Sequence, residues 1–343
     1  MKKHTTEHRF APVLLFLVLL SGCAGKPRVH EFQGSTMGTF FQVKVVTAAR
    51  VDGEALKAEI GERLETVNRL MSNWKDDSDV SRFNAAPTGQ AVTLDPHTAR
   101  VVARALQVAA DTGGAFDPTL SPLIDLWGFG SRDNGQSFPD DARIAEAAAR
   151  VGYHKLALDG TRLTKLADGV SLNLSALAKG YAVDLVYDTL VARGYTDFLV
   201  NVGGDGRVRG RNGAGNPWRM GIEAPDSARL QGIYTITEIS DTAMATSGDY
   251  RIFFERDGVR YSHLIDPRTS RPIPSHVTSV TIIAPDCMTA DAYATALSIL
   301  TPDEGLALVE RSPGLECFLI LRDADDRLSE RMSSGMGAYM AHP

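Results

Sequence analysis

Residues 170–184 read VSLNLSALAKGYAVD and join two patterns of different period. Val170–Leu174 alternates apolar and polar side chains, which predicts a short strand, and Ser175 can cap the amphipathic helix that the next residues predict. A helix start offers free backbone N–H groups and the positive end of the helix dipole, and Lys179 falls in the first turn. The junction is therefore typical of a diphosphate site, although a well-capped helix with a solvated lysine has the same pattern.

The rest of the chain is long and ordinary in composition. Its 343 residues can bury a large core as one big domain or as two interlocked halves. Hydrophobic residues make up 43%, charged residues 23%, and the net charge is −6, values typical of a soluble globular protein. The arginines are scattered and no basic stripe carries interleaved aromatics, so the sequence does not indicate a nucleic-acid binder.

The N-terminus has the pattern of a bacterial lipoprotein signal. A positively charged start is followed by an apolar run, Pro12–Leu20, and by small residues that lead to Cys23. We expect residues 1–22 to be removed and Cys23 to be lipidated; an ordinary signal peptide with a chance cysteine is the alternative. Acyl chains on Cys23 would anchor the protein to a bacterial membrane, facing the periplasm, with residues 23–32 as a tether.

A second helix carries candidate metal ligands. We expect it to span Thr289–Leu300 with Thr289 as its cap, and Asp291 and Thr295, four residues apart, then share one face. Asp291 would lie near the helix N-terminus, where a carboxylate is stabilised. Two hard oxygen ligands are too few for a closed cage but suit Mg²⁺, which completes its octahedron with waters and phosphates. An aspartate that only assists the helix cap is the alternative.

Three further features have both a structural and a functional interpretation. His263 has no second ligand nearby in sequence, so it is either structural or a base for a reacting hydroxyl. Trp74 is either a core aromatic or a stacking platform near a pocket mouth. Gly203–Gly206 follows a predicted strand but precedes more strand-like sequence, which favours a hairpin over a nucleotide loop.

Seven motifs follow one another as they do in the ApbE family, the FAD:protein FMN transferases. They are Gly34–Thr39, Met71–Trp74, Phe116-Asp117 with Leu126–Gly130, Asn173–Asp184, Val202–Asp205, His263–Pro267 and Ala290–Thr295. The chain resembles this family over nearly all of its mature length, residues 33–340. The resemblance implies an α+β fold, a single domain of two intertwined halves with an antiparallel sheet and packed helices.

The resemblance also implies an activity. Family members bind FAD with Mg²⁺, cleave its pyrophosphate, and move FMN onto a threonine hydroxyl of a target protein as a phosphoester, with release of AMP. The matching FAD contacts are Met37, Trp74, Ala115, Phe116, Asp117, Asn173, Lys179 and Ile265. The matching metal ligands are Asp291, Thr295 and the backbone carbonyl of Ala176, and His263 matches the histidine that activates the acceptor threonine.

The implied acceptors are flavin-bearing subunits of Na⁺-translocating NADH:quinone reductase or Rnf-type complexes. This chain carries no copy of the acceptor motif, so self-flavinylation is not expected. One alternative is an FAD pyrophosphatase, in which water replaces threonine. Another is a non-catalytic flavin-binding lipoprotein, against which Asp291, Thr295 and His263 argue. Ser270 stands where the family commonly has glycine, so that turn could differ in shape.

Overall fold

The computed structural model describes residues 26–129, 138–225, 232–248, 253–256, 259–274, 277–323 and 325–341, without the side chains of 253–256, 259–263 and 274. The predicted signal peptide, residues 1–22, and the predicted lipidation site, Cys23, lie outside the described residues. Within the part of the chain that the structure describes, no helix combines the length and the apolar character needed to cross a membrane.

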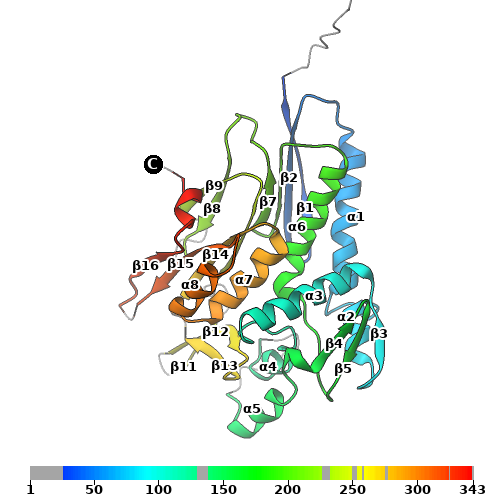
Figure 1. The fold of residues 1–343 in the computed structure, drawn as a ribbon, viewed down its shortest axis with the longest axis vertical. Coiled ribbons are helices and arrows are strands. Elements are labelled where there is room, and N and C mark those ends of the chain that lie inside the picture. Colours follow the sequence, from blue (N-terminus) through cyan, green and yellow to red (C-terminus); the bar gives the residue numbers. More distant parts are fainter. Residues whose placement is uncertain are drawn as a thin grey trace, which may run out of the picture.

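An eight-stranded antiparallel sheet forms the centre of the molecule, in the order β1-β2-β6-β7-β10-β14-β15-β16 (Figure 1). Its strands are β1 (Arg28–Thr36), β2 (Thr39–Thr47), β6 (Phe198–Val202), β7 (Asp205–Arg209), β10 (Ala243–Gly248), β14 (Val277–Ala284), β15 (Glu316–Arg322) and β16 (Leu328–Met332). The chain leaves the sheet after β2 and returns beside it as β6, pairing Phe41 with Val202. The N-terminal hairpin and the later strands therefore interlock, and the α+β prediction is confirmed.

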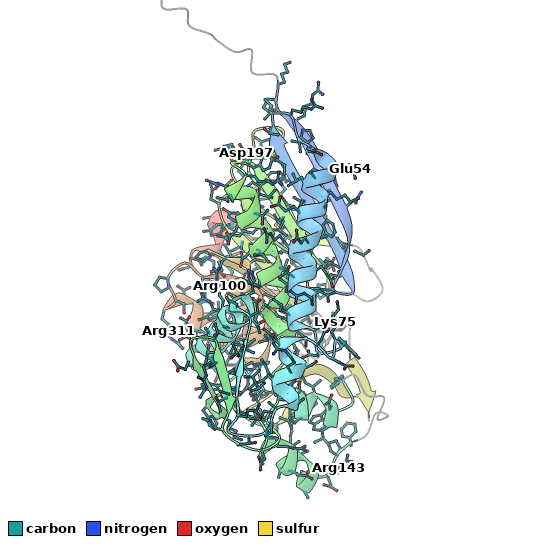
Figure 2. The ribbon with its side chains drawn as sticks, turned by 90° about the vertical axis from the view of Figure 1, so that its right-hand side faces the viewer. Glu54, Lys75, Arg100, Arg143, Asp197 and Arg311 are labelled. Atoms are coloured by element: carbon teal, nitrogen blue, oxygen red, sulfur yellow. The ribbon has the colours of Figure 1, made fainter. Side chains whose placement is uncertain are left out.

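Three helices, α1 (Gly53–Met71), α6 (Ser175–Ala192) and α7 (Cys287–Ile299), cover one face of this sheet. A fourth helix, α3 (Pro96–Asp111), packs against these three, and all four share the largest core. On α1 the buried residues Leu56, Ile60, Leu64 and Val67 recur at helical spacing, as expected for an amphipathic helix. Burying each such side chain contributes about 1.5–3 kcal/mol. Figure 2 shows α1 parallel to the long axis of the molecule, with Glu54 near its upper end, and Arg143 of α5 (Asp141–Ala148) at the lower end of the molecule.

The opposite face of the sheet is covered by a two-stranded sheet, β8 (Trp218–Glu223) with β9 (Ile233–Ile239), and by a short 3₁₀ helix, η3 (Met336–Tyr339). Trp218, Met244 and Phe318 belong to the core between these layers. Because the sheet is covered on both sides, all eight residues of β14 are buried. Helix α8 (Pro302–Glu310) follows α7 and begins with a capping box of Thr301 and Glu304.

Smaller elements complete the end of the molecule below α6 and α7 in Figure 1. They are α2 (Asp79–Ala85), β3 (Ala91–Thr93), α4 (Ser121–Leu126), α5 (Asp141–Ala148), η1 (Tyr153–Lys155), β4 (Leu156–Asp159), β5 (Arg162–Lys165), β11 (Phe253–Arg256), β12 (Val259–Asp266) and β13 (Arg271–Pro274). Leu123 of α4, Ile144 of α5 and Ile265 of β12 form a third core cluster, which brings β12 against α4.

The expected strand Val170–Leu174 was wrong. Residues 170–174 form no strand, because the backbone of Leu172 pairs with a side chain instead of a neighbouring strand. Leu172 N–H donates to Asn84 Oδ1 at 2.7 Å, and Asn84 Nδ2 donates back to the Leu172 carbonyl at 3.0 Å. The apolar alternation arises because Val170, Leu172 and Leu174 are all buried in the core.

Two element boundaries also differ from expectation. Helix α7 begins at Cys287 and is capped by Asp286, whose carboxylate accepts the Thr289 N–H, so Thr289 is not the cap. Asp291 therefore lies one turn inside the helix and not in its first turn. Arg28–Phe32, expected in the tether, form the first part of β1 and pair with β2.

Candidate active site

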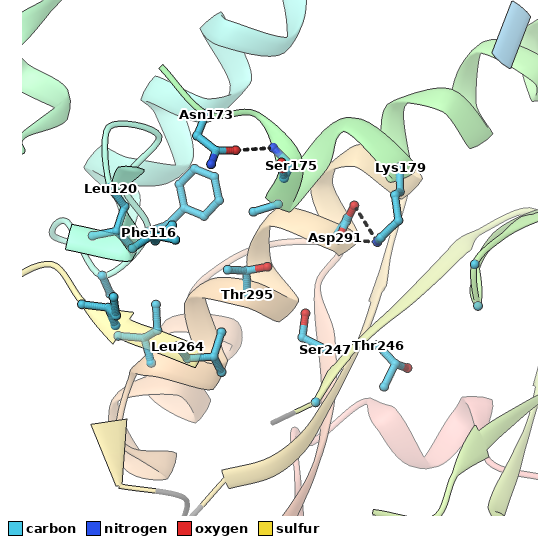
Figure 3. A pocket seen from close by; sticks show the side chains of 18 of the residues that line it. Phe116, Leu120, Asn173, Ser175, Lys179, Thr246, Ser247, Leu264, Asp291 and Thr295 are labelled. Carbon is cyan, nitrogen blue, oxygen red and sulfur yellow. Dashed lines mark hydrogen bonds and ion pairs between the residues drawn. The ribbon is translucent and has the colours of Figure 1, made fainter. Parts of the chain in front are cut away.

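A cavity of about 420 Å³ opens beside the first turn of α6 (Figure 3). It is bounded by α6, α7, the end of β10, part of β12 and the loop before α4. Predicted residues from segments far apart in the sequence line it: Ala115, Phe116, Asp117, Asn173, Ala176, Lys179, Ile265, Asp291 and Thr295. The fold thus brings the predicted metal ligands and most of the predicted FAD contacts to one place.

One wall of this cavity is apolar. Phe116, Leu120 and Leu264 are grouped on the left of Figure 3, and Ile124 and Ile265 also line the cavity. Phe116 and Ile265 are almost fully buried, at 3% and 1% exposure, so this wall is held in place by the core. An apolar wall of this kind suits a planar aromatic ring system.

At the opposite side of the cavity, Lys179 and Asp291 line the wall and Asp205 lies behind them, in contact with Lys179. Lys179 Nζ lies 3.3 Å from both carboxylate oxygens of Asp291 and forms an ion pair with Asp205 of β7. Burial alone would lower the pKa of Lys179, but the two carboxylates outweigh it and raise that pKa. Burial also raises the pKa of Asp291 to about 7, against the opposing effect of Lys179. The sequence predicted that the N-terminus of its own helix would stabilise the Asp291 carboxylate. In the structure Lys179 and a backbone N–H of α6 do so instead.

That backbone N–H belongs to Gly180 and donates to Asp291 Oδ2 at 3.0 Å. In an α-helix the N–H of residue 180 ordinarily faces the carbonyl of residue 176, so the Ala176 carbonyl and the Asp291 carboxylate converge on one N–H group. Helices α6 and α7 touch here, since a Cβ on Gly180 would lie 2.3 Å from the Cys287 carbonyl oxygen. Thr295 follows one turn after Asp291 and lines the same cavity (Figure 3).

These oxygens fit a magnesium ion. Among the described residues no cluster of three or more His, Cys, Asp or Glu side chains is placed to hold a metal. One carboxylate, one hydroxyl and one carbonyl leave coordination positions open, and Mg²⁺ typically fills such positions with water and substrate phosphates. Asp291, Thr295 and Ala176 could therefore hold Mg²⁺ where Lys179 could also reach a phosphate.

Met37 and Trp74 lie on the other side of the first turn of α6. They line a second hollow of about 580 Å³, which shares Ser175 and Lys179 with the main cavity. Trp74 is 74% exposed, so it is not a core aromatic, and a flat exposed ring beside a hollow can serve as a stacking platform. Met37 has a positive φ of 45° in the tight turn between β1 and β2.

The expected cradle of free N–H groups at the start of α6 is largely occupied by the protein itself. Leu174, and not Ser175, occupies the N-cap position, and the Ser175 N–H donates to Asn173 Oδ1 at 3.0 Å. The N–H groups of Leu177 and Ala178 donate to the Leu174 carbonyl. The attraction of this site for a diphosphate therefore depends on Lys179 and on a metal ion more than on the open helix end.

Asp117 shapes the cavity instead of pointing a free carboxylate into it. Its oxygens accept the N–H and the hydroxyl of Thr119 and the N–H of Tyr153. Burial raises the pKa of the Asp117 carboxyl despite these hydrogen bonds. The residue fixes the loop that carries Ala115 and Phe116.

The comparison with known families decides the relationship of the chain. The sequence profile of the ApbE family matches residues 37–319. The chain belongs to the ApbE family. An FAD:protein FMN transferase of Vibrio cholerae is 38% identical to this ApbE chain over 329 residues, which cover 96% of it and 98% of the relative. Another, from Haemophilus influenzae, is 36% identical and covers 88% and 89%.

Solved structures agree with this relationship. The flavin transferase ApbE from Vibrio cholerae matches with a TM-score of 0.84 at 37% identity, covering 92% of this chain and all 100% of that one. The apo form of the Pseudomonas stutzeri flavinyl transferase ApbE also gives a TM-score of 0.84, at 38% identity, with coverage of 92% and 98%. The ApbE fold therefore extends over nearly the whole described chain.

Three further positions of this ApbE chain bear on the sequence-based predictions. Asp205 was missed as a site residue, although it directly follows Gly203-Gly204, and the turn between β6 and β7 brings it to Lys179. His263 lies on β12, close to Leu264 and Ile265, and its side chain is outside the described residues. Ser270 has a φ of 60°, so it adopts the left-handed conformation that glycine favours and the turn keeps that shape.

Proposed function

We propose that this chain is an FAD:protein FMN transferase, which moves FMN from FAD to a threonine hydroxyl of a target protein and releases AMP. One observation carries the proposal: a single cavity is lined by an apolar wall, by the half-buried Lys179, and by Ala176, Asp291 and Thr295, whose oxygens are the proposed metal ligands. Relatives that cover nearly its whole length carry the same activity in their names.

Different residues would bind different parts of FAD. The apolar wall around Phe116 would hold a ring system, and Trp74 would stack on the part of the dinucleotide that extends toward solvent. Lys179 would turn from its carboxylate partners toward the diphosphate, whose negative charge it can partly neutralise. Asn173 would hold the first turn of α6 in place through its bond to Ser175.

Asp291, Thr295 and the Ala176 carbonyl would hold Mg²⁺ against the diphosphate. When bound, the metal would withdraw charge from the scissile phosphate, which is the main requirement of phosphoryl transfer. Burial keeps water away from the Asp291 carboxylate, so its interaction with a cation is stronger than it would be at the surface. His263, on the strand that brings Leu264 and Ile265 to the cavity, would accept the proton of the attacking threonine hydroxyl.

The location and the partners are further parts of the proposal. Lipidation of Cys23 would anchor the protein to a bacterial membrane, with the enzyme domain in the periplasm. The domain would follow its anchor closely, because β1 starts only a few residues after Cys23. The acceptors would be flavin-bearing subunits of Na⁺-translocating NADH:quinone reductase or Rnf-type complexes, which present a threonine for modification.

The test is to incubate the protein with FAD, Mg²⁺ and a peptide that bears the acceptor motif, and to weigh the peptide. A mass gain of one FMN supports transfer. Free FMN and AMP with an unmodified peptide would favour the pyrophosphatase, and unchanged FAD would leave only flavin binding. A parallel reaction with a chelator in place of Mg²⁺ separates the metal requirement from the acceptor requirement.

A further inference from the structure

Asp184 is a buried carboxylate of α6 that does not line the active-site cavity. Its side chain is only 4% exposed. Oδ1 accepts the Cys287 N–H at 3.0 Å and Nη1 of Arg207 at 2.8 Å, and Oδ2 accepts the Met288 N–H at 2.9 Å. Cys287 and Met288 are the first two residues of α7.

The start of α7 is therefore capped from two directions. Its own preceding residue, Asp286, accepts the Thr289 N–H at 2.8 Å, which is the usual arrangement of an N-cap. The two earlier N–H groups, which a helix cannot satisfy internally, are taken up by a residue of another helix. Negative charge at a helix N-terminus is favourable, so Asp184 holds α7 against α6 at this point.

The second contact between the two helices lies one turn away on each of them. Gly180 precedes Asp184 by four residues, and Asp291 follows Cys287 by four residues. The Gly180 N–H donates to Asp291 one turn after Ala176, which lines the cavity. Two levels of contact, Asp184 with Cys287 and Gly180 with Asp291, therefore fix how far α7 is shifted along α6.

Arg207 orients the Asp184 carboxylate. Its guanidinium carbon lies 3.9 Å from the centre of the Tyr187 ring, and its Nη1 donates to Asp184. Three donors from two elements thus surround a carboxylate that burial alone would disfavour. A carboxylate suits this position because its two oxygens together can accept from two backbone N–H groups and one guanidinium.

We propose that Asp184 is a positioning residue for the magnesium site: by clamping the first turn of α7 to α6, it sets the spacing between the Asp291 carboxylate and the Ala176 carbonyl. The inference rests on the metal ligands assigned under the proposed function. Residues that orient metal ligands from outside the coordination sphere typically change metal affinity 10–100-fold when they are replaced.

The test compares Asp184→Asn with Asp188→Asn, the same change at an exposed position one turn further along α6. Asn has the size of Asp but turns an N–H₂ group toward one of the two backbone N–H groups, so the clamp loses one bond. Mg²⁺ is titrated calorimetrically into FAD-loaded protein without acceptor peptide, and FAD affinity is measured separately in a chelator. We expect Asp184→Asn to weaken Mg²⁺ binding about 10–100-fold, with metal-free FAD affinity unchanged, and Asp188→Asn to match the wild type.

Arg207→Gln supplies a second variant should Asp184→Asn not fold. It keeps both backbone N–H groups as donors to Asp184 but removes the guanidinium that also holds Oδ1, so it should weaken Mg²⁺ binding by a smaller factor without loss of FAD affinity. Wild-type Mg²⁺ affinity in a folded Asp184→Asn protein, or in Arg207→Gln if only that one folds, would overturn the role of Asp184. If the wild type itself bound no Mg²⁺, the metal assignment of the proposed function would fail instead.

Discussion

Lys179 Nζ lies 3.3 Å from each carboxylate oxygen of Asp291, so the ammonium group faces the carboxylate symmetrically. A metal ion bound by Asp291 would approach the same carboxylate. Lys179 therefore neutralises two buried carboxylates, Asp291 and Asp205. If a metal ion took its place beside Asp291, the Lys179 ammonium group would be free to turn toward the phosphates. This exchange would link the stability of the domain to its metal content.

Removal of the carboxylate at position 291 should abolish most of the activity. Asp291→Ala deletes the only carboxylate among the proposed metal ligands, and metal assistance contributes several kcal/mol to such reactions. We expect turnover to fall about 10²–10⁴-fold, measured as FMN transferred to an acceptor peptide at saturating Mg²⁺. Undiminished activity of this variant would remove the metal assignment.

Loss of the lysine should destabilise the metal-free domain. Lys179→Met leaves Asp205 and Asp291, which are both buried, without their shared cation. Breaking a buried pair in this way costs several kcal/mol, and allowing for the solvent that reaches Lys179 we expect a loss of about 1–3 kcal/mol in the free energy of unfolding at pH 8. Added Mg²⁺ should restore part of it. The exposed Lys57→Met is the control, and equal losses in both variants would contradict the prediction.

A methyl group at position 180 should push α6 and α7 apart. The Cβ of Gly180→Ala would meet the backbone carbonyl of Cys287 at 2.3 Å, and a backbone atom cannot move aside as a side chain can. We expect a loss of about 1–3 kcal/mol in the free energy of unfolding, together with weaker activation by Mg²⁺. Gly61→Ala on α1 meets no atom within 4 Å and should instead gain about 0.5–1 kcal/mol. Thermal unfolding of both variants measures these differences. An unchanged free energy of unfolding in Gly180→Ala would contradict the prediction.

The stability of the wild type relative to Asp184→Asn should fall as the pH rises. Burial raises the pKa of Asp184 to about 6, against the effect of Arg207 and with a contribution from Asp286. Since the unfolded chain releases this proton near pH 4, the contribution is complete below that pH and is lost as the pH rises through about 6. We expect the difference in unfolding free energy to shift by up to about 3 kcal/mol between pH 4 and 7, measured by urea unfolding. A pH-independent difference would show that Asp184 titrates normally.

Glycine at position 270 should stabilise the protein. Ser270 has a φ of 60°, a left-handed conformation in which a side chain is strained by about 1 kcal/mol. Its carbonyl accepts the Trp127 Nε1–H at 3.0 Å, a contact that needs the backbone and not the hydroxyl. Ser270→Gly should therefore raise the unfolding free energy by up to about 1 kcal/mol with unchanged turnover. Ser270→Ala, which removes the hydroxyl but keeps the strain, should show no such gain.

Patterns that act over short distances could be predicted from the sequence. The apolar spacing of α1, the Asp95-Pro96 start of α3 and the capping box before α8 all involve neighbours along the chain, and all are present. The strand at Val170–Leu174 could not be excluded from its pattern, because the group that replaces its strand partner, Asn84, is far away in sequence.

By itself the sequence determined the family and the identity of the residues that carry chemistry, because residue types and their order are properties of the chain. The tertiary structure alone decided which charges meet. Asp205, Lys179 and Asp291 come from a strand and two helices, and only their packing brings the three charges into contact and shifts the pKa values of Lys179 and Asp291. The same holds for Asp184, whose role depends on backbone N–H groups that no side-chain pattern records.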